Sequence, residues 1–184
     1  MLPQLEILLP ADVGLKAWNH EEVQETFWGN SLGKARSLFD ENSSGLPVLA
    51  DDSGICVSAL GGSPGVFSAR FGETEFGRSL SDQEKNVLLL KKMEGIVERQ
   101  ASFVCCLTLV ISSERFFSVQ ESWTGVIAEE PRGKNGFGYD PIFYLPDRGR
   151  VSAELDPEEK NKISHRGRAV HRISVLLDDL FRNP

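Results

Sequence analysis

Three short clusters of the sequence contain residue types that could do chemistry. In the first, Asp51-Asp52-Ser53-Gly54, two carboxylates directly follow an apolar run. Charged side chains are rarely buried without a partner, so we expect a carboxylate to face a site at a strand end. Neighbouring side chains on an extended segment point to opposite faces, so only one of the two acids should face that site. The alternative is a turn in which an Asp side chain caps backbone amides.

The second cluster is the glycine-rich segment GKNGFGYDP, residues 133–141. Glycines let a backbone approach a ligand closely. Phe137 and Tyr139 offer aromatic faces on which a nucleobase could stack. The alternative is a hairpin loop whose aromatic rings pack on the core.

The third cluster is EEKNKISHRGRAVHR, residues 158–172, in which Lys160, His165, Arg166 and Arg168 surround a helix start predicted at Ser164. Helix N-termini attract anions through free amides and the helix dipole. Cations at that end oppose the dipole, which indicates another partner such as a phosphate. The alternative is an ordinary solvated charged face.

Composition bounds the kind of protein that carries these clusters. With 184 residues the chain is long enough for one domain with a sizeable core. A net charge of -7 argues against general electrostatic binding of nucleic acid or an anionic membrane. No apolar run is long enough to span a bilayer, and no signal peptide is evident. Three cysteines without zinc-ligand spacing are typical of reduced core thiols, so we expect a cytoplasmic protein.

The elements that must position the clusters follow from periodicity. Helices are predicted over residues 26–43, over 81–95 and from about Ser164 to the end. Ser81 and Glu84 form a capping box for the second of these. Strands are predicted over residues 5–10, 46–50, 55–60, 101–112, 115–128 and 142–146. The last helix should bury an apolar stripe made of Ala169, Val170, Ile173, Leu176, Leu177 and Leu180. The pattern predicts an α/β domain around a mixed sheet.

Long motifs in a fixed order resemble one family. LPVLADDSGICVSALGGSPGVFSARFG closely resembles the signature of the inosine triphosphate pyrophosphatases, also called the Ham1/RdgB-like family of noncanonical purine nucleoside triphosphatases. RGKNGFGYDPIF, AEL at 153–155 and EKNKISHRGRAV are similar to its later motifs, in the same order. EEVQETFWGNSLGKAR resembles its EETGxTFxxNAxxKA segment. The resemblance covers the chain from about Glu21 to the C-terminus.

The resemblance implies a fold and an activity. The fold is a mixed, twisted sheet flanked by helices around a central cleft, as in the Maf and Ham1 proteins. The activity is hydrolysis of ITP, dITP and XTP to the monophosphate and pyrophosphate, with Mg²⁺ as cofactor and a homodimer as the usual assembly. Mg²⁺ suits a site with few carboxylates, because phosphate oxygens and water complete its shell.

The resemblance also implies roles for individual residues. Asp52 matches the catalytic acid, which is both a metal ligand and the proton acceptor for the attacking water. Glu22 matches the second acidic metal position, with Glu21 as the alternative. The positions that match substrate-binding residues are Lys34, Ser53, Phe137, Gly138, Tyr139, Asp140, Lys160, His165 and Arg166. Arg166 has donors only, so adenine with its 6-amino donor would leave it unpaired.

The chain departs from the family pattern at its start. Family members open with a strand and a TGNxxK loop that cradles the triphosphate, and MLPQLEILLPADVGLK contains no counterpart. We therefore expect a single domain, residues 1–184, that is truncated at its N-terminus relative to the family. Two alternative functions follow: a weakly active or inactive nucleotide-binding remnant, and a Maf-like nucleotide pyrophosphatase.

Overall fold

The fold is seen in a computed structural model that describes residues 6–182, with side chains up to residue 180. The helices are α1 Phe27–Glu41, α2 Glu73–Phe76, α3 Asp82–Lys92, α4 Pro157–Ile163 and α5 His165–Arg182. The strands are β1 Val48–Val57, β2 Gln100–Val110, β3 Phe116–Ile127, β4 Phe143–Leu145 and β5 Arg150–Val151. Short 3-10 helices are Pro10–Val13, Ser58–Leu60, Gly65–Phe67, Asp140–Ile142 and Ser152–Glu154. The five strands form one sheet in chain order, with β3–β4 and β4–β5 antiparallel.

Contacts divide the chain into two compact units. The first contains residues 1–52, 105–121 and 168–184, and the second contains residues 53–104 and 122–167. The expectation of one domain stays a prediction. Within residues 6–182, no helix is both long enough and apolar enough to cross a membrane.

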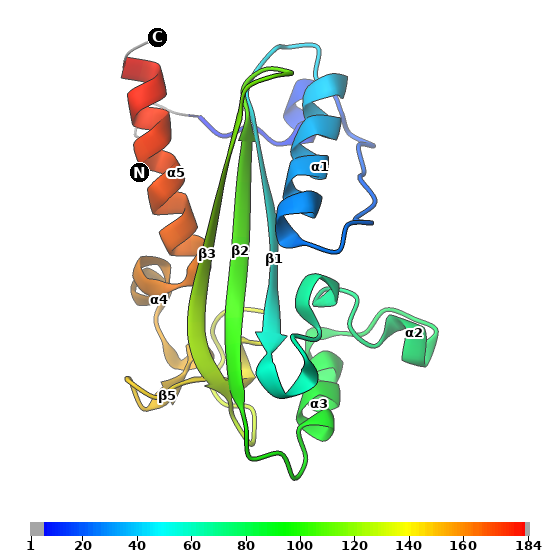
Figure 1. Cartoon of the computed structure of the whole chain (residues 1–184), viewed down its shortest axis with the longest axis vertical. Helices are drawn as coiled ribbons and strands as arrows, with labels where there is room; N and C mark the ends of the chain where they lie inside the picture. The colour runs from blue at the N-terminus through cyan, green and yellow to red at the C-terminus, as the bar shows by residue number, and fades with distance from the viewer. Residues whose placement is uncertain (1–5, 183–184) are drawn as a thin grey trace. The chain divides into compact units, whose positions relative to one another are not determined.

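In the first unit, helices cover both faces of β2. Cys105, Leu107 and Leu109 form a buried cluster with Ala169 and Ile173 of α5. The intervening side chains face α1: Val110 packs with Ala35, and Thr108 shares a 2.8 Å hydrogen bond with Ser31. Figure 1 shows α1 and α5 on opposite sides of the strands. Two covered faces explain why β2 is an almost continuous apolar run instead of an alternating one.

The second unit has its own core. Its largest buried side chains include Ile55, Leu89, Met93, Ile142 and Phe143, contributed by β1, α3 and the segment around β4. α3 begins as predicted: Ser81 accepts a hydrogen bond from the Glu84 amide, and the Glu84 carboxylate accepts one from the Ser81 amide at 2.8 Å. α3 is therefore anchored at its start and buried along one side.

Several predicted elements are confirmed and others are wrong. The helix over 26–43, the helix at 81 and the final helix exist, with Thr26 and Ser164 accepting bonds from amides of the first turn. The strand over 5–10 is wrong: residues 6–9 have no regular structure, Pro10 begins a 3-10 helix, and Leu5 lies outside the described residues. Val170 was assigned to the buried stripe but is 42% exposed.

The most consequential error concerns the paired aspartates. Residues 46–50 and 55–60 were predicted as separate strands with the acids at a strand end, or in a turn. β1 instead runs without interruption from Val48 to Val57, so Asp51 and Asp52 lie in mid-strand. Residues 58–60 form a 3-10 helix. The turn alternative is therefore wrong as well.

Candidate active site

A buried carboxylate cluster lies in the first unit. Asp52 on β1 is 5% exposed, and its Oδ1 lies 3.1 Å from Nζ of Lys34 on α1. The same Nζ lies 2.8 Å from Oε1 of Glu22, so one ammonium joins two carboxylates. Asn30 of α1 donates from Nδ2 to Asp52 Oδ2 at 3.3 Å and accepts from the Gln24 amide at 2.9 Å. Helix α1 thus fixes both the acid and the segment that carries Glu22.

The electrostatics of this cluster follow from its burial. Burial raises the pKa of Asp52 above the usual carboxyl value, although the charge and hydrogen bond of Lys34 oppose the rise. For Lys34, burial alone would lower the pKa, but the hydrogen bond to Glu22 and the charge of Asp52 outweigh it, so the pKa is raised. Asp52 is therefore a stronger base than an exposed carboxylate, and Lys34 stays charged.

The two acids of each neighbouring pair have different surroundings in the structure. Glu22 bonds to Lys34, whereas Glu21 is exposed. Asp51 accepts from the Cys105 thiol of β2 at 3.5 Å, whereas Asp52 bonds to α1. The two neighbouring aspartates thus have partners on different elements, as strand alternation requires.

The carboxylates of Asp52 and Glu22 suit a hard divalent cation. Both converge on one positive charge, the Lys34 ammonium. Mg²⁺ is usually held by one or two carboxylates, with phosphate oxygens and water as the remaining ligands. Across residues 6–182, no group of three or more His, Cys, Asp or Glu side chains could hold a metal by itself. The pair therefore fits a cation that arrives with a phosphate-bearing ligand.

A small pocket lies in the second unit. Its volume is about 210 Å³. All the predicted substrate-binding residues of this unit line it: Ser53, Phe137, Gly138, Tyr139, Asp140, Lys160, His165 and Arg166. Ser68, Asp82, Lys85 and Phe103 line it too, and sequence reasoning missed them. The structure thus brings together three segments far apart in the sequence.

Two cations lie over an exposed aromatic side chain at this pocket. Phe137 is 64% exposed, with Lys160 Nζ at 5.1 Å and Arg166 Cζ at 5.5 Å from the centroid of its ring. The His165 ring is buried and stacks on Phe103, with centroids 4.8 Å apart and planes 9° apart. An accessible ring beside fixed donors can stack a heterocyclic base and bond to its edge.

Two of the predicted binding residues also hold the loop in shape. Asp140 is buried; its Oδ2 accepts from the Phe137 amide at 2.9 Å and from Lys160 Nζ at 2.5 Å. Its Oδ1 accepts from the Ser152 hydroxyl at 2.8 Å. Tyr139 is also buried and donates from its hydroxyl to the Ser68 carbonyl at 2.8 Å. These bonds fix the loop that presents Phe137.

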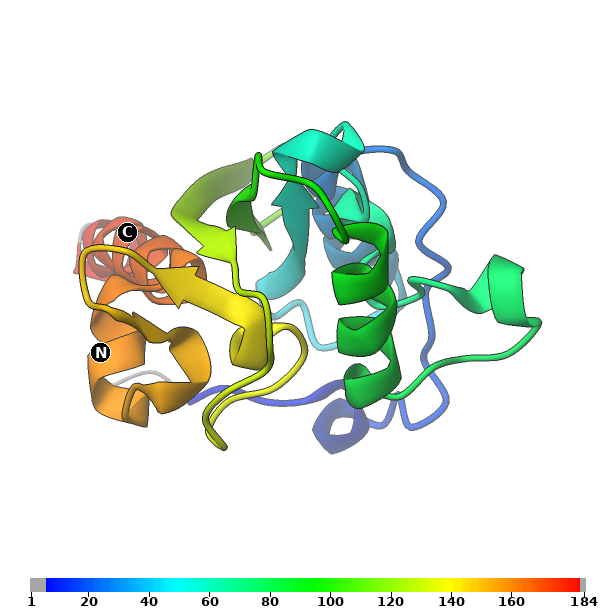
Figure 2. The same ribbon diagram turned by 90° about the horizontal axis from the view of Figure 1, so that it is seen from below.

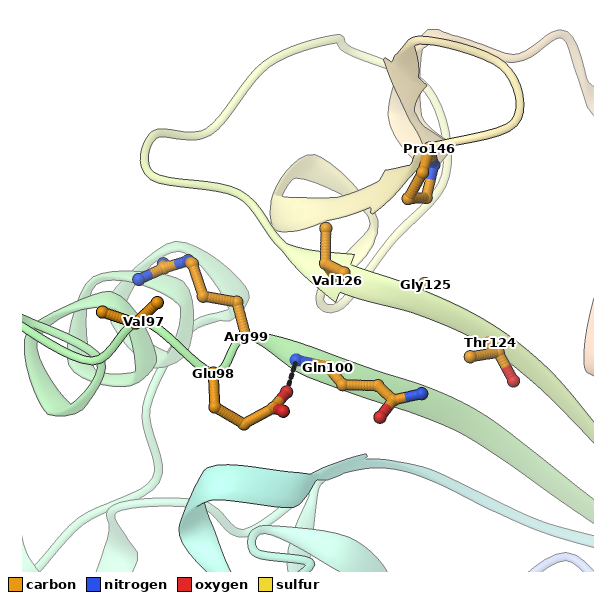
Figure 3. A pocket seen from close by; sticks show the side chains of 8 residues that line it. All are labelled: Val97, Glu98, Arg99, Gln100, Thr124, Gly125, Val126 and Pro146. Carbon is orange, nitrogen blue, oxygen red and sulfur yellow. Dashed lines mark hydrogen bonds between the residues drawn. The ribbon is translucent and has the colours of Figure 1, made fainter.

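A second, larger cavity of about 680 Å³ lies elsewhere in the second unit (Figure 3). Its lining residues are Val97, Glu98, Arg99, Gln100, Thr124, Gly125, Val126 and Pro146. Arg99 and Glu98 in its lining form hydrogen bonds with nearby backbone groups. Arg99 donates to the carbonyls of Ile127 and Ala128, and Glu98 accepts from the Gln100 amide at 2.6 Å. Size alone does not make this cavity a site, since polar groups do not converge in it.

Comparison with known proteins places the chain in a family. The sequence model described as Ham1 family matches residues 3–175. The chain belongs to the Ham1 family. The dITP/XTP pyrophosphatase of Treponema denticola is 45% identical over 177 residues, which cover 96% of this chain and 89% of that protein. The dITP/XTP pyrophosphatase of Coxiella burnetii is 43% identical over 184 residues, which cover 98% and 85%.

Solved Ham1 structures share the fold. The HAM1 protein of Coxiella burnetii matches with a TM-score of 0.80 and 44% identity, covering 88% of this chain and 81% of that one. The Ham1 protein of Staphylococcus aureus gives a TM-score of 0.80 at 34% identity, covering 89% and 82%. These matches confirm the predicted family and the α/β fold class.

Proposed function

We propose that this Ham1 protein is a nucleoside triphosphate pyrophosphohydrolase that converts dITP, ITP and XTP to the monophosphate and pyrophosphate. The supporting observation in the structure is the pocket in which Lys160 and Arg166 lie beside the exposed Phe137 ring. Relatives at 42–46% identity carry the name dITP/XTP pyrophosphatase, which agrees with that pocket.

In the proposed reaction, Phe137 stacks on the purine, and Arg166 and His165 read its 6-oxo edge. Water attacks the α-phosphorus and forms a new P–O bond. The bond between the α-phosphorus and the oxygen that bridges to the β-phosphorus breaks, which releases pyrophosphate. Asp52 accepts the proton from the attacking water, and its raised pKa favours that transfer. Lys34 holds Asp52 in place and supplies positive charge toward the phosphates.

Asp52 and Glu22 would hold the divalent cation, which we propose is Mg²⁺. When bound, this ion would polarise the α-phosphate and offset its negative charge. We also propose a homodimer, by analogy with the family, and a cytoplasmic location. The three free cysteines, two of them buried, agree with a reducing compartment.

Pyrophosphate release from ITP, XTP and ATP, with identification of the nucleotide product, tests the proposal. We expect the monophosphate and pyrophosphate from ITP and XTP in the presence of Mg²⁺, with little turnover of ATP. Asp52→Asn should lower kcat by at least about a hundredfold, because a general base and a metal ligand are lost together. Asp51→Asn is the matched control, since Asp51 bonds to Cys105, and it should cost far less. Release of the nucleoside diphosphate and inorganic phosphate, or no turnover, would contradict the proposed function.

A further inference from the structure

Reading the 6-oxo group cannot by itself explain a preference for dITP and XTP. Guanine carries the same 6-oxo acceptor as hypoxanthine and xanthine. The three bases differ at C2, which carries hydrogen in hypoxanthine, an oxo group in xanthine and an amino group in guanine. If the proposed function is right, a donor at Arg166 rejects adenine but accepts GTP. Some other group must therefore respond to position 2.

Helix α3 supplies a wall of the pocket that the motifs do not include. Asp82 and Lys85 both line the pocket, and Nζ of Lys85 lies 3.3 Å from Oδ1 of Asp82. The Lys85 side chain is only 12% exposed. Oδ2 of Asp82 accepts from the Gly138 amide at 2.8 Å, and Asn86 donates to the Gly138 carbonyl at 3.0 Å. α3 and the loop of residues 133–141 lie side by side in Figure 2. Asp82 thus ties the Lys85 ammonium to the loop that carries Phe137.

Several hydrogen-bond donors line the pocket, and the two carboxylates among them already accept hydrogen bonds from the protein. Asp82 accepts from Gly138 and Lys85, and Asp140 accepts from Phe137, Lys160 and Ser152. Lys85, Lys160 and Arg166 have no acceptor atom on their charged groups. An oxo group brought against these donors can accept from them, whereas an amino group brought against them cannot.

The volume of the pocket limits the size of the group that it can enclose. About 210 Å³ is less than the ~300–1,000 Å³ typical of a site for a whole drug-sized ligand. The cavity therefore suits a single base. A donor brought against another donor in such a space leaves both without a partner.

We propose that Lys85, held by Asp82, is a specificity-determining residue that excludes guanine. Lys85 donates to the 2-oxo group of xanthine, accommodates the C2 hydrogen of hypoxanthine and opposes the 2-amino group of guanine. Loss of the ammonium acts twice: it removes the opposing donor, and it frees Oδ1 of Asp82 to accept a bond from that amino group.

The test is binding of xanthosine, inosine and guanosine monophosphates, measured by calorimetry on the full chain. Lys85→Met keeps the aliphatic stem and removes the charge. Lys85→Arg keeps the donors. Lys91→Met is a matched control, because Lys91 is exposed on the same helix. We expect the wild type to bind the guanosine form at least about tenfold more weakly than the xanthosine form. Lys85→Met should shrink that ratio by about tenfold, while Lys85→Arg and Lys91→Met preserve it.

Two results would overturn the role of Lys85. One is an unchanged ratio in Lys85→Met whose melting temperature shows that it is folded. The other is a wild type that binds the xanthosine and guanosine forms equally. Turnover gives the separate readout on the proposed function: a wild type that binds selectively but releases no pyrophosphate from XTP would contradict that function and leave the binding role of Lys85 supported. In an active enzyme, the GTP-to-XTP ratio of kcat/KM should rise in Lys85→Met by the same factor as the binding ratio.

Discussion

Removing the Lys34 charge should destabilise the protein through the carboxylate it leaves behind. In Lys34→Met the stem of the side chain remains, but Asp52, 5% exposed, loses its cation. Breaking a fully buried pair from one side costs about 3–5 kcal/mol. Lys34 and Glu22 are 16% and 27% exposed, so solvent screening reduces this, and we expect about 2 kcal/mol at pH 7. For a chain of this length, that corresponds to roughly 4–8 °C in melting temperature.

The loss should depend on pH in a direction fixed by Asp52. Burial raises the pKa of Asp52 already in the wild type, and removing Lys34 raises it further. A carboxyl whose folded pKa exceeds its unfolded value binds more protons in the folded state. Its contribution to stability is therefore largest at low pH and falls as pH rises through that window. The deficit of Lys34→Met relative to wild type should shrink between pH 7 and pH 4.

Urea denaturation of four proteins at both pH values measures this effect: wild type, Lys34→Met, Asp52→Asn and the double variant. Adding Asp52→Asn to Lys34→Met should restore most of the lost stability, because the unpaired charge is gone. Lys92→Met is the control, since the Lys92–Glu75 pair is exposed and should be worth at most about 1 kcal/mol. A pH-independent loss in Lys34→Met, or no rescue by Asp52→Asn, would refute an uncompensated charge as the cause.

Three further predictions concern the pocket and α3. Arg166→Ala should lower the ratio of kcat/KM for ITP over ATP by roughly tenfold to a hundredfold, as expected for a hydrogen bond to a charged group; a fixed ratio would show that Arg166 does not read the base. The Arg78 hydrogen bond holds the pKa of Glu84 at about 2, so the difference in melting temperature between wild type and Glu84→Gln should be full above pH 5 and disappear as pH falls toward 2; a constant difference would exclude this pairing. Gly136→Ala should lower the melting temperature and weaken nucleotide binding, because Gly136 has φ +78° and a Cβ there would lie 2.0 Å from Asp140 Oδ2; an unperturbed variant would show that the loop adjusts freely.

The features predicted best from the sequence are those that depend on interactions between residues close together in the chain. The cap at Ser81 and the glycine-rich loop follow from interactions within a few residues, so both were found. The continuity of β1 was missed because Asp51, Asp52 and Gly54 disfavour strands locally. Tertiary partners override that preference: Lys34 and Asn30 engage Asp52, and Cys105 engages Asp51.

Some site residues could likewise be predicted from the sequence, whereas others could not. The residues within long motifs were predicted together, and the structure brings Glu22, Lys34 and Asp52 into one cluster. Asp82 and Lys85 were missed because they are far from the loop in sequence, Asp82 lying 56 positions before Gly138, on a helix whose charges resemble an ordinary solvated face. Only the packing of α3 against that loop distinguishes them from surface residues.

The unbroken course of β1 has a consequence for how this gene can change. Asp51 and Asp52 are distinguished only by which side of the strand each one occupies, and side chains alternate along it. Inserting or deleting one codon upstream in β1 would turn each aspartate to the opposite side of the strand without altering either residue. A change of one residue in length across residues 48–52 should therefore be as damaging as substitution of Asp52 itself. Natural insertions and deletions should be absent from this stretch and collect in turns such as 111–115, where the chain reverses between β2 and β3.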